Sequence, residues 1–179
     1  MNLEPVVVHI ASLRRYARAL TGDAWAADDL VQDTLERACS KWRLWLAGTD
    51  LRAWLFTVMH NLYIGQVRQG LTRAKLVPTV DMDDVMHELR APDASTDFTI
   101  DLQRCLLRLP PEQRVVLLLV TLEDMPYGQV AKVTGTPIGT VMSRLSRARE
   151  RMRELMDEPR EPTVGQVPVN AAPVLRRMK

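Results

Sequence analysis

The spacing of the apolar residues limits the possible folds of this chain more than any other feature. Along most of the sequence these residues recur every three or four positions, which matches the α-helical turn of about 3.6 residues rather than the alternation of a strand. The 179 residues contain only 8 glycines, so composition also favours helix. The chain is therefore predicted to be all-α, with room for one medium domain or two small ones.

Three helices are predicted within residues 1–70, the first lobe. The first helix ends at Gly22, the second starts near Ala24, and the third follows the N-cap residue Asp50 and runs toward Arg68. Their apolar stripes consist of Val6, Ile10, Leu13, Ala17 and Leu20, then Val31, Leu35, Ala38 and Trp42, then Leu51, Trp54, Leu55, Val58 and Leu62. Three such stripes can share one core, so residues 1–70 are predicted to form a small helical domain.

Residues 100–156, the second lobe, are predicted to contain a helix-turn-helix. A short helix over 127–134 precedes Gly135, and a longer basic helix follows, with Thr136 as its N-cap and Pro137 in its first position. The expected buried stripe of this last helix is Ile138, Val141, Leu145, Ala148, Met152 and Leu155. A short helix, a glycine turn and a basic helix, in this order, are typical of DNA-binding proteins.

Charge is unevenly distributed along the chain. Residues 80–101 carry seven acids against Arg90 alone, a net charge of −6, whereas the whole chain is at +2. Helical periodicity fades in the same region, so residues 71–99 are predicted to be a flexible acidic linker between two basic lobes. Residues 157–179 contain four prolines and no apolar stripe, and a disordered tail is expected there. This charge pattern indicates strongly charged partners.

One face of the last helix carries the residues best suited to bind DNA. Steps of three and four place Thr140, Ser143, Arg144, Arg147 and Arg151 opposite the apolar stripe. A helix of this width fits the major groove, where guanidinium groups bind guanine edges or phosphates. Basicity alone favours a merely solvated surface helix, but the preceding glycine turn and short helix favour DNA binding.

Nothing in the sequence predicts catalysis, a metal or a cofactor. The acids Asp28, Asp29, Asp33 and Glu36 have no histidine nearby and are expected on a solvated helical face. The three histidines are isolated, and no glycine-rich phosphate loop occurs. Asn61 could be a surface or capping residue, or it could contact an exposed base. Residue chemistry alone does not decide between these two roles.

The same features indicate a cytoplasmic protein without membrane insertion. The longest apolar run, Val115 to Val120, has six residues, against about 20 for a membrane span. No secretory signal is recognisable at the start of the chain. Cys39 and Cys105 belong to no paired motif, which argues against a disulfide framework or a zinc site.

Several segments resemble the extracytoplasmic-function (ECF) sigma factors, promoter-specificity subunits of bacterial RNA polymerase in the sigma-seventy family. The segment 28–34 (DDLVQDT) resembles their core-binding helix, and 52–55 (RAWL) with 60–62 (HNL) resembles their promoter-melting helix. In the second lobe, 109–114 (LPPEQR) and 139–149 (GTVMSRLSRAR) resemble the region that recognises the minus-thirty-five element. Each segment alone is weak evidence for the family, but the presence of all of them in this order is specific for it.

The resemblance implies a role for each group of residues. Asp29, Gln32 and Asp33 would bind core polymerase, on the coiled coil of its largest subunit. Asn61 would capture a flipped minus-ten base, with Arg68 nearby along the displaced strand. Thr140, Ser143, Arg144 and Arg147 would contact the minus-thirty-five duplex, whereas Met142 replaces a residue that is often basic. An anti-sigma protein is an expected partner. The alternative is a stand-alone helix-turn-helix regulator that binds operator DNA through the second lobe.

Overall fold

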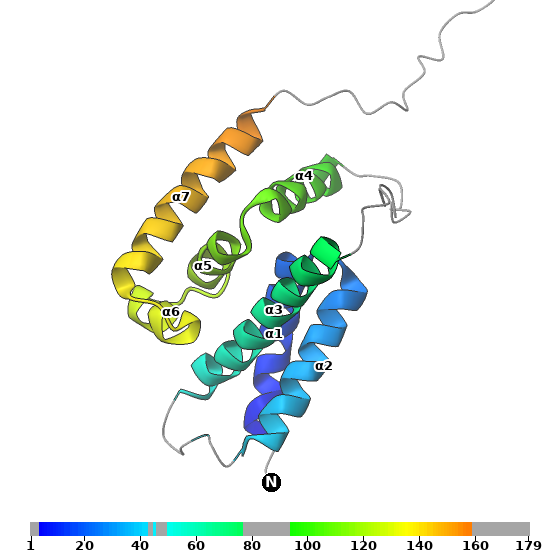
Figure 1. Cartoon of the computed structure of the whole chain (residues 1–179), viewed down its shortest axis with the longest axis vertical. Coiled ribbons are helices and arrows are strands. Elements are labelled where there is room, and N and C mark those ends of the chain that lie inside the picture. The colour runs from blue at the N-terminus through cyan, green and yellow to red at the C-terminus, as the bar shows by residue number, and fades with distance from the viewer. Residues whose placement is uncertain (1–3, 43–44, 46–49, 77–93, 159–179) are drawn as a thin grey trace, which may run out of the picture.

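The computed structural model describes residues 4–42, 45, 50–76 and 94–158, which form seven helices and no strand (Figure 1). The helices are α1 (Glu4–Thr21), α2 (Ala24–Ser40), α3 (Leu51–Leu76), α4 (Ala94–Arg108), α5 (Pro111–Thr121), α6 (Tyr127–Thr134) and α7 (Ile138–Asp157). The prediction of an all-α fold is confirmed. None of the described helices is long and apolar enough to cross a bilayer.

The first lobe is a three-helix bundle formed by α1, α2 and α3. Gly22 joins α1 to α2 with a φ of 75°, a left-handed conformation that glycine adopts without strain. Asp50 accepts a 3.1 Å hydrogen bond from the backbone amide of Ala53, which confirms the predicted cap of α3. Inside the bundle, the rings of Tyr16 and Phe56 pack edge to face with centroids 5.2 Å apart.

The second lobe places the helix-turn-helix pair α6 and α7 against α5. α5 is buried along Val115–Leu119, and α6 ends at Gly135, whose φ is 62°. Val141, Leu145, Ala148, Met152 and Leu155 of α7 are buried, as their spacing predicts. The amphipathic pattern therefore specifies this helix and its orientation.

Two details at the start of α7 contradict the sequence predictions. Ile138 is 51% exposed, because α7 begins at this residue and its first turn precedes the first packed position, Val141. The N-cap is Pro137, without a side-chain cap bond, and not Thr136. The Thr136 hydroxyl lies 2.8 Å from the hydroxyl of Thr134 instead.

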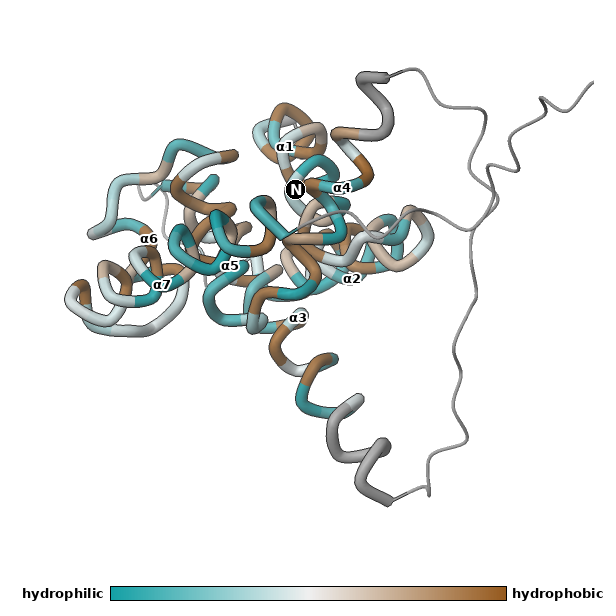
Figure 2. Tube along the Cα trace, turned by 90° about the horizontal axis from the view of Figure 1, so that it is seen from above, coloured by the Kyte–Doolittle hydropathy of each residue, from teal (hydrophilic) through white to brown (hydrophobic). Residues whose placement is uncertain are grey.

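The predicted linker is shorter than 71–99. α3 continues to Leu76 and α4 begins at Ala94, so both ends of that segment are helical. Figure 2 shows the C-terminal part of α3 projecting away from the other helices. The rest of the predicted linker and the predicted tail from 159 onward lie outside the described residues.

The two lobes pack against each other. One apolar cluster extends from Val6 in α1 to Leu155 in α7, and α1 contacts α4 and α5 while α3 contacts α6. The turn between α1 and α2 takes part, since a Cβ added at Gly22 would come within 2.5 Å of the Leu107 side chain in α4. Residues from both lobes therefore face one another across a continuous interface.

Candidate functional site

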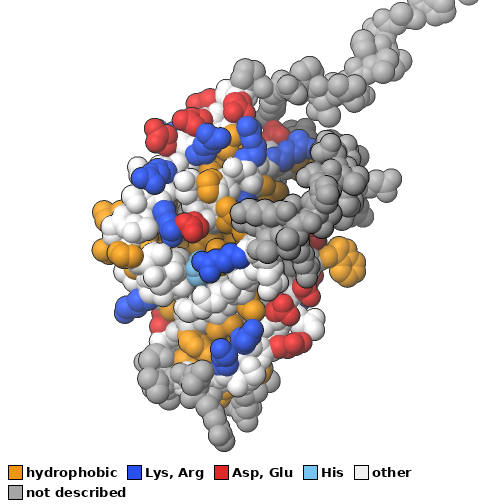
Figure 3. Space-filling model, in the orientation of Figure 1, with side chains coloured by type: hydrophobic (Ala, Val, Ile, Leu, Met, Phe, Trp, Pro, Cys, Tyr) orange, Lys and Arg blue, Asp and Glu red, His pale blue; other side chains and the backbone are white. Residues whose placement is uncertain are grey.

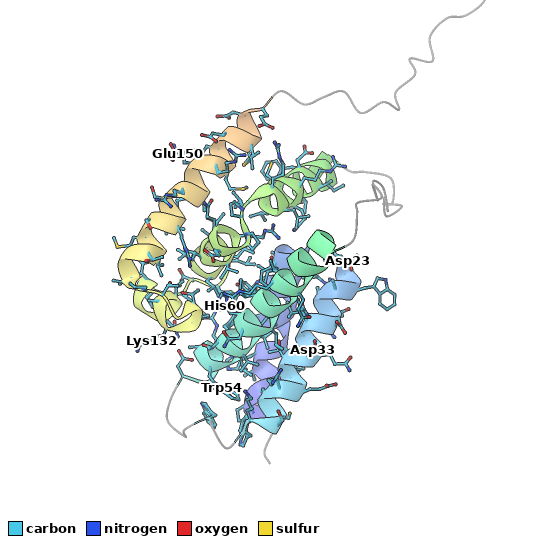
Figure 4. All side chains as sticks on the ribbon, in the orientation of Figure 1. Asp23, Asp33, Trp54, His60, Lys132 and Glu150 are labelled. Carbon is cyan, nitrogen blue, oxygen red and sulfur yellow. The ribbon has the colours of Figure 1, made fainter. Side chains whose placement is uncertain are left out.

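The acidic face of α2 is exposed. Asp29 and Gln32 are exposed and Asp33 is half-buried, and Gln32 donates a 3.0 Å hydrogen bond to Glu36. Figure 4 places Asp33 on α2, across the molecule from α7. Trp25, in the first turn of the same helix, is 82% exposed. The structure thus brings the three predicted polymerase-binding residues onto one helix, close to an unburied indole.

The predicted minus-ten residues lie on α3. Asn61 and Arg68 are both exposed. Seven residues make about two helical turns, so the two residues share one face of α3 and lie about 10 Å apart along its axis. His60, beside Asn61, is half-buried between α3 and the second lobe (Figure 4). Burial lowers the pKa of His60 to about 4, and the nearby Arg144 acts in the same direction. His60 is therefore neutral near pH 7.

The predicted minus-thirty-five residues occupy the polar face of α7. Ser143 and Arg147 are exposed, and Thr140 is half-buried. Arg144 is half-buried and forms an ion pair with Glu112 of α5, so its guanidinium group is held by its own lobe. Figure 3 shows basic side chains spread over the face in view, with acidic side chains both at its upper end and along its lower right edge.

Beside this polar face, the start of α7 also presents apolar side chains. Ile138 and Met142, four residues apart, are both more than half exposed. Apolar groups at the groove-facing end of a recognition helix can contact thymine methyl groups. The exposed surface of α7 therefore combines cationic, hydroxyl and apolar side chains.

A buried acid that the sequence did not reveal as important lies between the lobes. Glu123, in the turn between α5 and α6, has a side chain with 0% exposure and accepts hydrogen bonds from Arg15 at 2.9 Å and Arg52 at 2.8 Å. Arg52 also donates to the Glu123 backbone carbonyl at 2.6 Å. Arg15 comes from α1 and Arg52 from α3, so the carboxylate of the second lobe binds two helices of the first.

Arg114 of α5 is a second polar group at this interface. Its guanidinium donates to the carbonyl oxygens of Leu20 at 2.8 Å, Leu107 at 2.6 Å and Leu109 at 3.0 Å, and to the Tyr63 hydroxyl at 3.3 Å. Leu20 lies in the last turn of α1, where the carbonyl groups lack helical partners. Arg114 therefore satisfies acceptors from both lobes while being only 8% exposed.

An apolar groove of about 550 Å³ runs between the second lobe and the end of α1. Leu102, Leu106, Leu117 and Met152 are among its lining residues, with Arg149 and Arg153 also in the lining. Its shape and chemistry suit the apolar face of a helix.

The described residues form no metal-binding cluster. No group of three or more His, Cys, Asp or Glu side chains in the described ranges is arranged to hold a metal ion. Cys39 is half-buried and Cys105 is buried, and both are free thiols.

Both halves of the chain match known sigma-factor families. Residues 6–60 match the family described as the Sigma2 domain of PhyR, and residues 99–152 match sigma-70 region 4. The ECF RNA polymerase sigma factor EcfG of Rhodopseudomonas palustris (strain TIE-1) is 33% identical over 154 residues, which cover 86% of this chain and 83% of EcfG. The ECF RNA polymerase sigma factor SigM of Mycobacterium tuberculosis (strain H37Rv) is 32% identical over 148 residues, covering 83% and 73%.

Solved structures show the same relationship. The sigma factor RpoE of Bartonella quintana, solved with the anti-sigma factor NepR, superposes with a TM-score of 0.68 at 30% identity, over 88% of this chain and 97% of RpoE. The resemblance inferred from sequence is confirmed. The chain belongs to the ECF sigma factors, the subunits that bind core RNA polymerase, recognise promoter DNA and promote transcription initiation.

Proposed function

We propose that three separate surfaces divide the work of this sigma factor. The acidic face of α2 binds core polymerase, the exposed face of α3 engages the melted minus-ten strand, and the polar face of α7 reads the minus-thirty-five duplex. One observation supports this division most strongly: the residues predicted for each of the three surfaces lie together on a single helix and are exposed or half-buried there. The α2 face also lies across the molecule from α7 (Figure 4), so both can be occupied at once.

The polymerase-binding surface combines charge with an apolar anchor. Asp29, Gln32 and Asp33 provide acceptors and negative charge. Trp25 precedes Asp29 by one helical turn and leaves its indole in solvent. Tryptophan is enriched among the residues that dominate the binding energy of interfaces, so Trp25 belongs to the same proposed surface.

The DNA-binding residues differ in how firmly they are held. Arg144 is fixed by Glu112 and would present a preoriented guanidinium to the duplex, whereas Arg147 is exposed and free to adjust to a base edge. Asn61, exposed on α3, is suited to hydrogen-bond a base taken out of the stack.

The protein acts by binding alone, with no catalysis and no cofactor of its own, and it works in the cytoplasm, where polymerase and promoter are found.

Asp33→Arg is expected to weaken binding to purified core RNA polymerase at least about tenfold. Reversal of a charge at the centre of the acidic face replaces an attraction with a repulsion, and close like charges at an interface cost about 1.4 kcal/mol or more. Fluorescence anisotropy of the labelled protein, titrated with core enzyme, measures the change. Glu154→Arg, a reversal in the exposed last turns of α7, should bind core enzyme normally. Equal affinities for both variants would remove the α2 face from the proposal.

The apolar groove is proposed as the seat of an anti-sigma helix. The RpoE structure was solved in complex with the anti-sigma factor NepR, and an unfilled apolar groove with cationic neighbours suits an amphipathic helix with acidic residues. Leu102→Glu should weaken binding to a NepR-type anti-sigma protein about tenfold in calorimetric titrations. Arg104→Glu, on an exposed part of α4, should change it little. Full affinity in Leu102→Glu would place the partner elsewhere.

A further inference from the structure

The first turns of α7 carry two large apolar side chains that the protein does not bury. Ile138 is 51% exposed and Met142 is 53% exposed. Four residues separate them, so both lie on the same side of the helix. Single exposed apolar residues are common on protein surfaces, whereas neighbouring ones suggest a surface that contacts a partner. This apolar side of α7 adjoins the polar face that carries Ser143 and Arg147.

Met142 also lines a depression between α6 and α7. The depression has a volume of about 300 Å³, and its lining includes Tyr127 from the start of α6 together with Ser146, Arg149 and Arg153 of α7. Among the described residues, this lining contains two arginines and no acidic side chain. Apolar side chains beside guanidinium and hydroxyl groups suit duplex DNA, which combines charged phosphates with base edges that are partly apolar.

The backbone at the start of α7 is open to a close approach. Gly139 lies in the first turn, and a Cβ built there would meet no atom within 4 Å. No described neighbour therefore requires glycine at this position, and glycine lets a ligand approach the backbone. Figure 1 shows the start of α7 beside α6, at the outer edge of the molecule. The first residues of a recognition helix are those that contact base edges, and Met142 is among them.

The chemistry of the thioether limits what Met142 can recognise. Methionine has no hydrogen-bond donor, and its sulfur is only a weak acceptor. It is therefore a poor reader of the donors and acceptors that distinguish guanine, adenine and cytosine. Thymine differs from these bases in the major groove by its C5 methyl group, which is apolar. A flexible, polarizable side chain packs readily against such a group.

We propose that Met142 is a specificity-determining residue, which selects a thymine in the minus-thirty-five element by contacting its C5 methyl group. Ile138 extends the apolar contact from the preceding turn. Arg149 and Arg153, about two and three turns further along the same side of α7, contact the neighbouring phosphates, which position the helix but carry no sequence information. This inference rests on the proposed function, because it assumes that α7 lies in the major groove of that element.

Deoxyuridine tests the proposal, because it differs from thymidine only by the missing C5 methyl group. Holoenzyme is reconstituted from the full chain and core enzyme, and each thymidine in the minus-thirty-five element of a promoter that it transcribes is replaced singly, in both strands. At one position we expect the affinity, measured by competition binding, to fall about fourfold, as for the loss of one buried methyl-sized group. In holoenzyme carrying Met142→Ala, the same replacement should leave the affinity unchanged, since the contact is already absent.

Met156→Ala is the matched control. Met156 is another exposed methionine of α7, at 48% exposure, but it lies in the last turn of the helix. Holoenzyme carrying Met156→Ala should retain the full response to deoxyuridine. Circular dichroism should show the same helix content in both variants and in the unmutated protein.

Three results would overturn the inference: equal affinity for thymidine and deoxyuridine at every position in the unmutated holoenzyme, a response to deoxyuridine that persists in Met142→Ala, or a minus-thirty-five element without thymine in either strand. A scrambled minus-thirty-five element that binds holoenzyme as tightly as the original would instead count against the proposed function, and the inference would fail with it.

Discussion

Arg114→Ala should lower the free energy of unfolding by about 3–5 kcal/mol, the range typical of removing one partner from a buried charged network. Truncation to Ala removes every donor that the guanidinium supplies, so the buried carbonyl groups of Leu20 and Leu109 and the partly buried carbonyl group of Leu107 lose their partner. Each such loss costs roughly 1–3 kcal/mol. Urea denaturation followed by circular dichroism gives the change directly.

Two control variants separate this effect from the loss of a positive charge. Arg104→Ala removes an exposed arginine of α4 whose ion pair with Asp101 is long, at 3.9 Å, and should alter stability by no more than about 0.5 kcal/mol. Arg114→Lys keeps the charge but not the planar fork, so it should fall between the two. If Arg114→Ala is as stable as Arg104→Ala, the hydrogen bonds at the interface do not stabilise the fold as described.

Arg147→Ala should weaken binding to the minus-thirty-five element by about 1–3 kcal/mol, and discrimination should be lost at one base pair only. Arg147 is exposed on the polar face of α7, and its guanidinium can form two hydrogen bonds to a guanine edge. Competition binding against duplexes carrying every single base-pair change measures both quantities, with salt held constant.

Arg151→Ala provides the comparison. Arg151 is one turn further along α7, is exposed, and lies 3.7 Å from Glu154, and we expect it to contact phosphate rather than a base. Removal of its side chain should weaken binding to all duplexes about equally and reduce the salt dependence of the binding constant. Should Arg147→Ala give this uniform pattern as well, Arg147 is also a phosphate contact, and sequence recognition must depend on other residues of α7.

Local features of the fold could be predicted from the sequence because they depend on residues near one another in the chain. The bounds of α6, the buried face of α7 and the Asp50 cap of α3 all follow from periodicity and from short side-chain contacts. The same reasoning failed at Ile138, where apolar spacing continues past the point at which neighbouring helices provide a packing surface.

The inter-lobe contacts could not be predicted in this way. Glu123 pairs with Arg15 and Arg52 across separations of 108 and 71 residues, and in the sequence it is one acid in a turn. Arg144 likewise belongs to a DNA-binding motif, and only the three-dimensional structure reveals its pairing with Glu112. An ion pair between residues far apart in the chain produces no periodic pattern in the sequence. The helices that carry the three proposed surfaces could be predicted from sequence segments, but the packing of the two lobes against each other could not.

In vitro transcription is the most direct test of the central claim, that the two lobes act together on one promoter while bound to polymerase. Purified protein and bacterial core enzyme are incubated with a library of promoter fragments, and the transcripts are sequenced at their starts. The account predicts initiation at fixed sites preceded by two common elements, at minus ten and minus thirty-five, and loss of initiation when either element is replaced. Initiation that never exceeds the level of core enzyme alone, on any template, would contradict it.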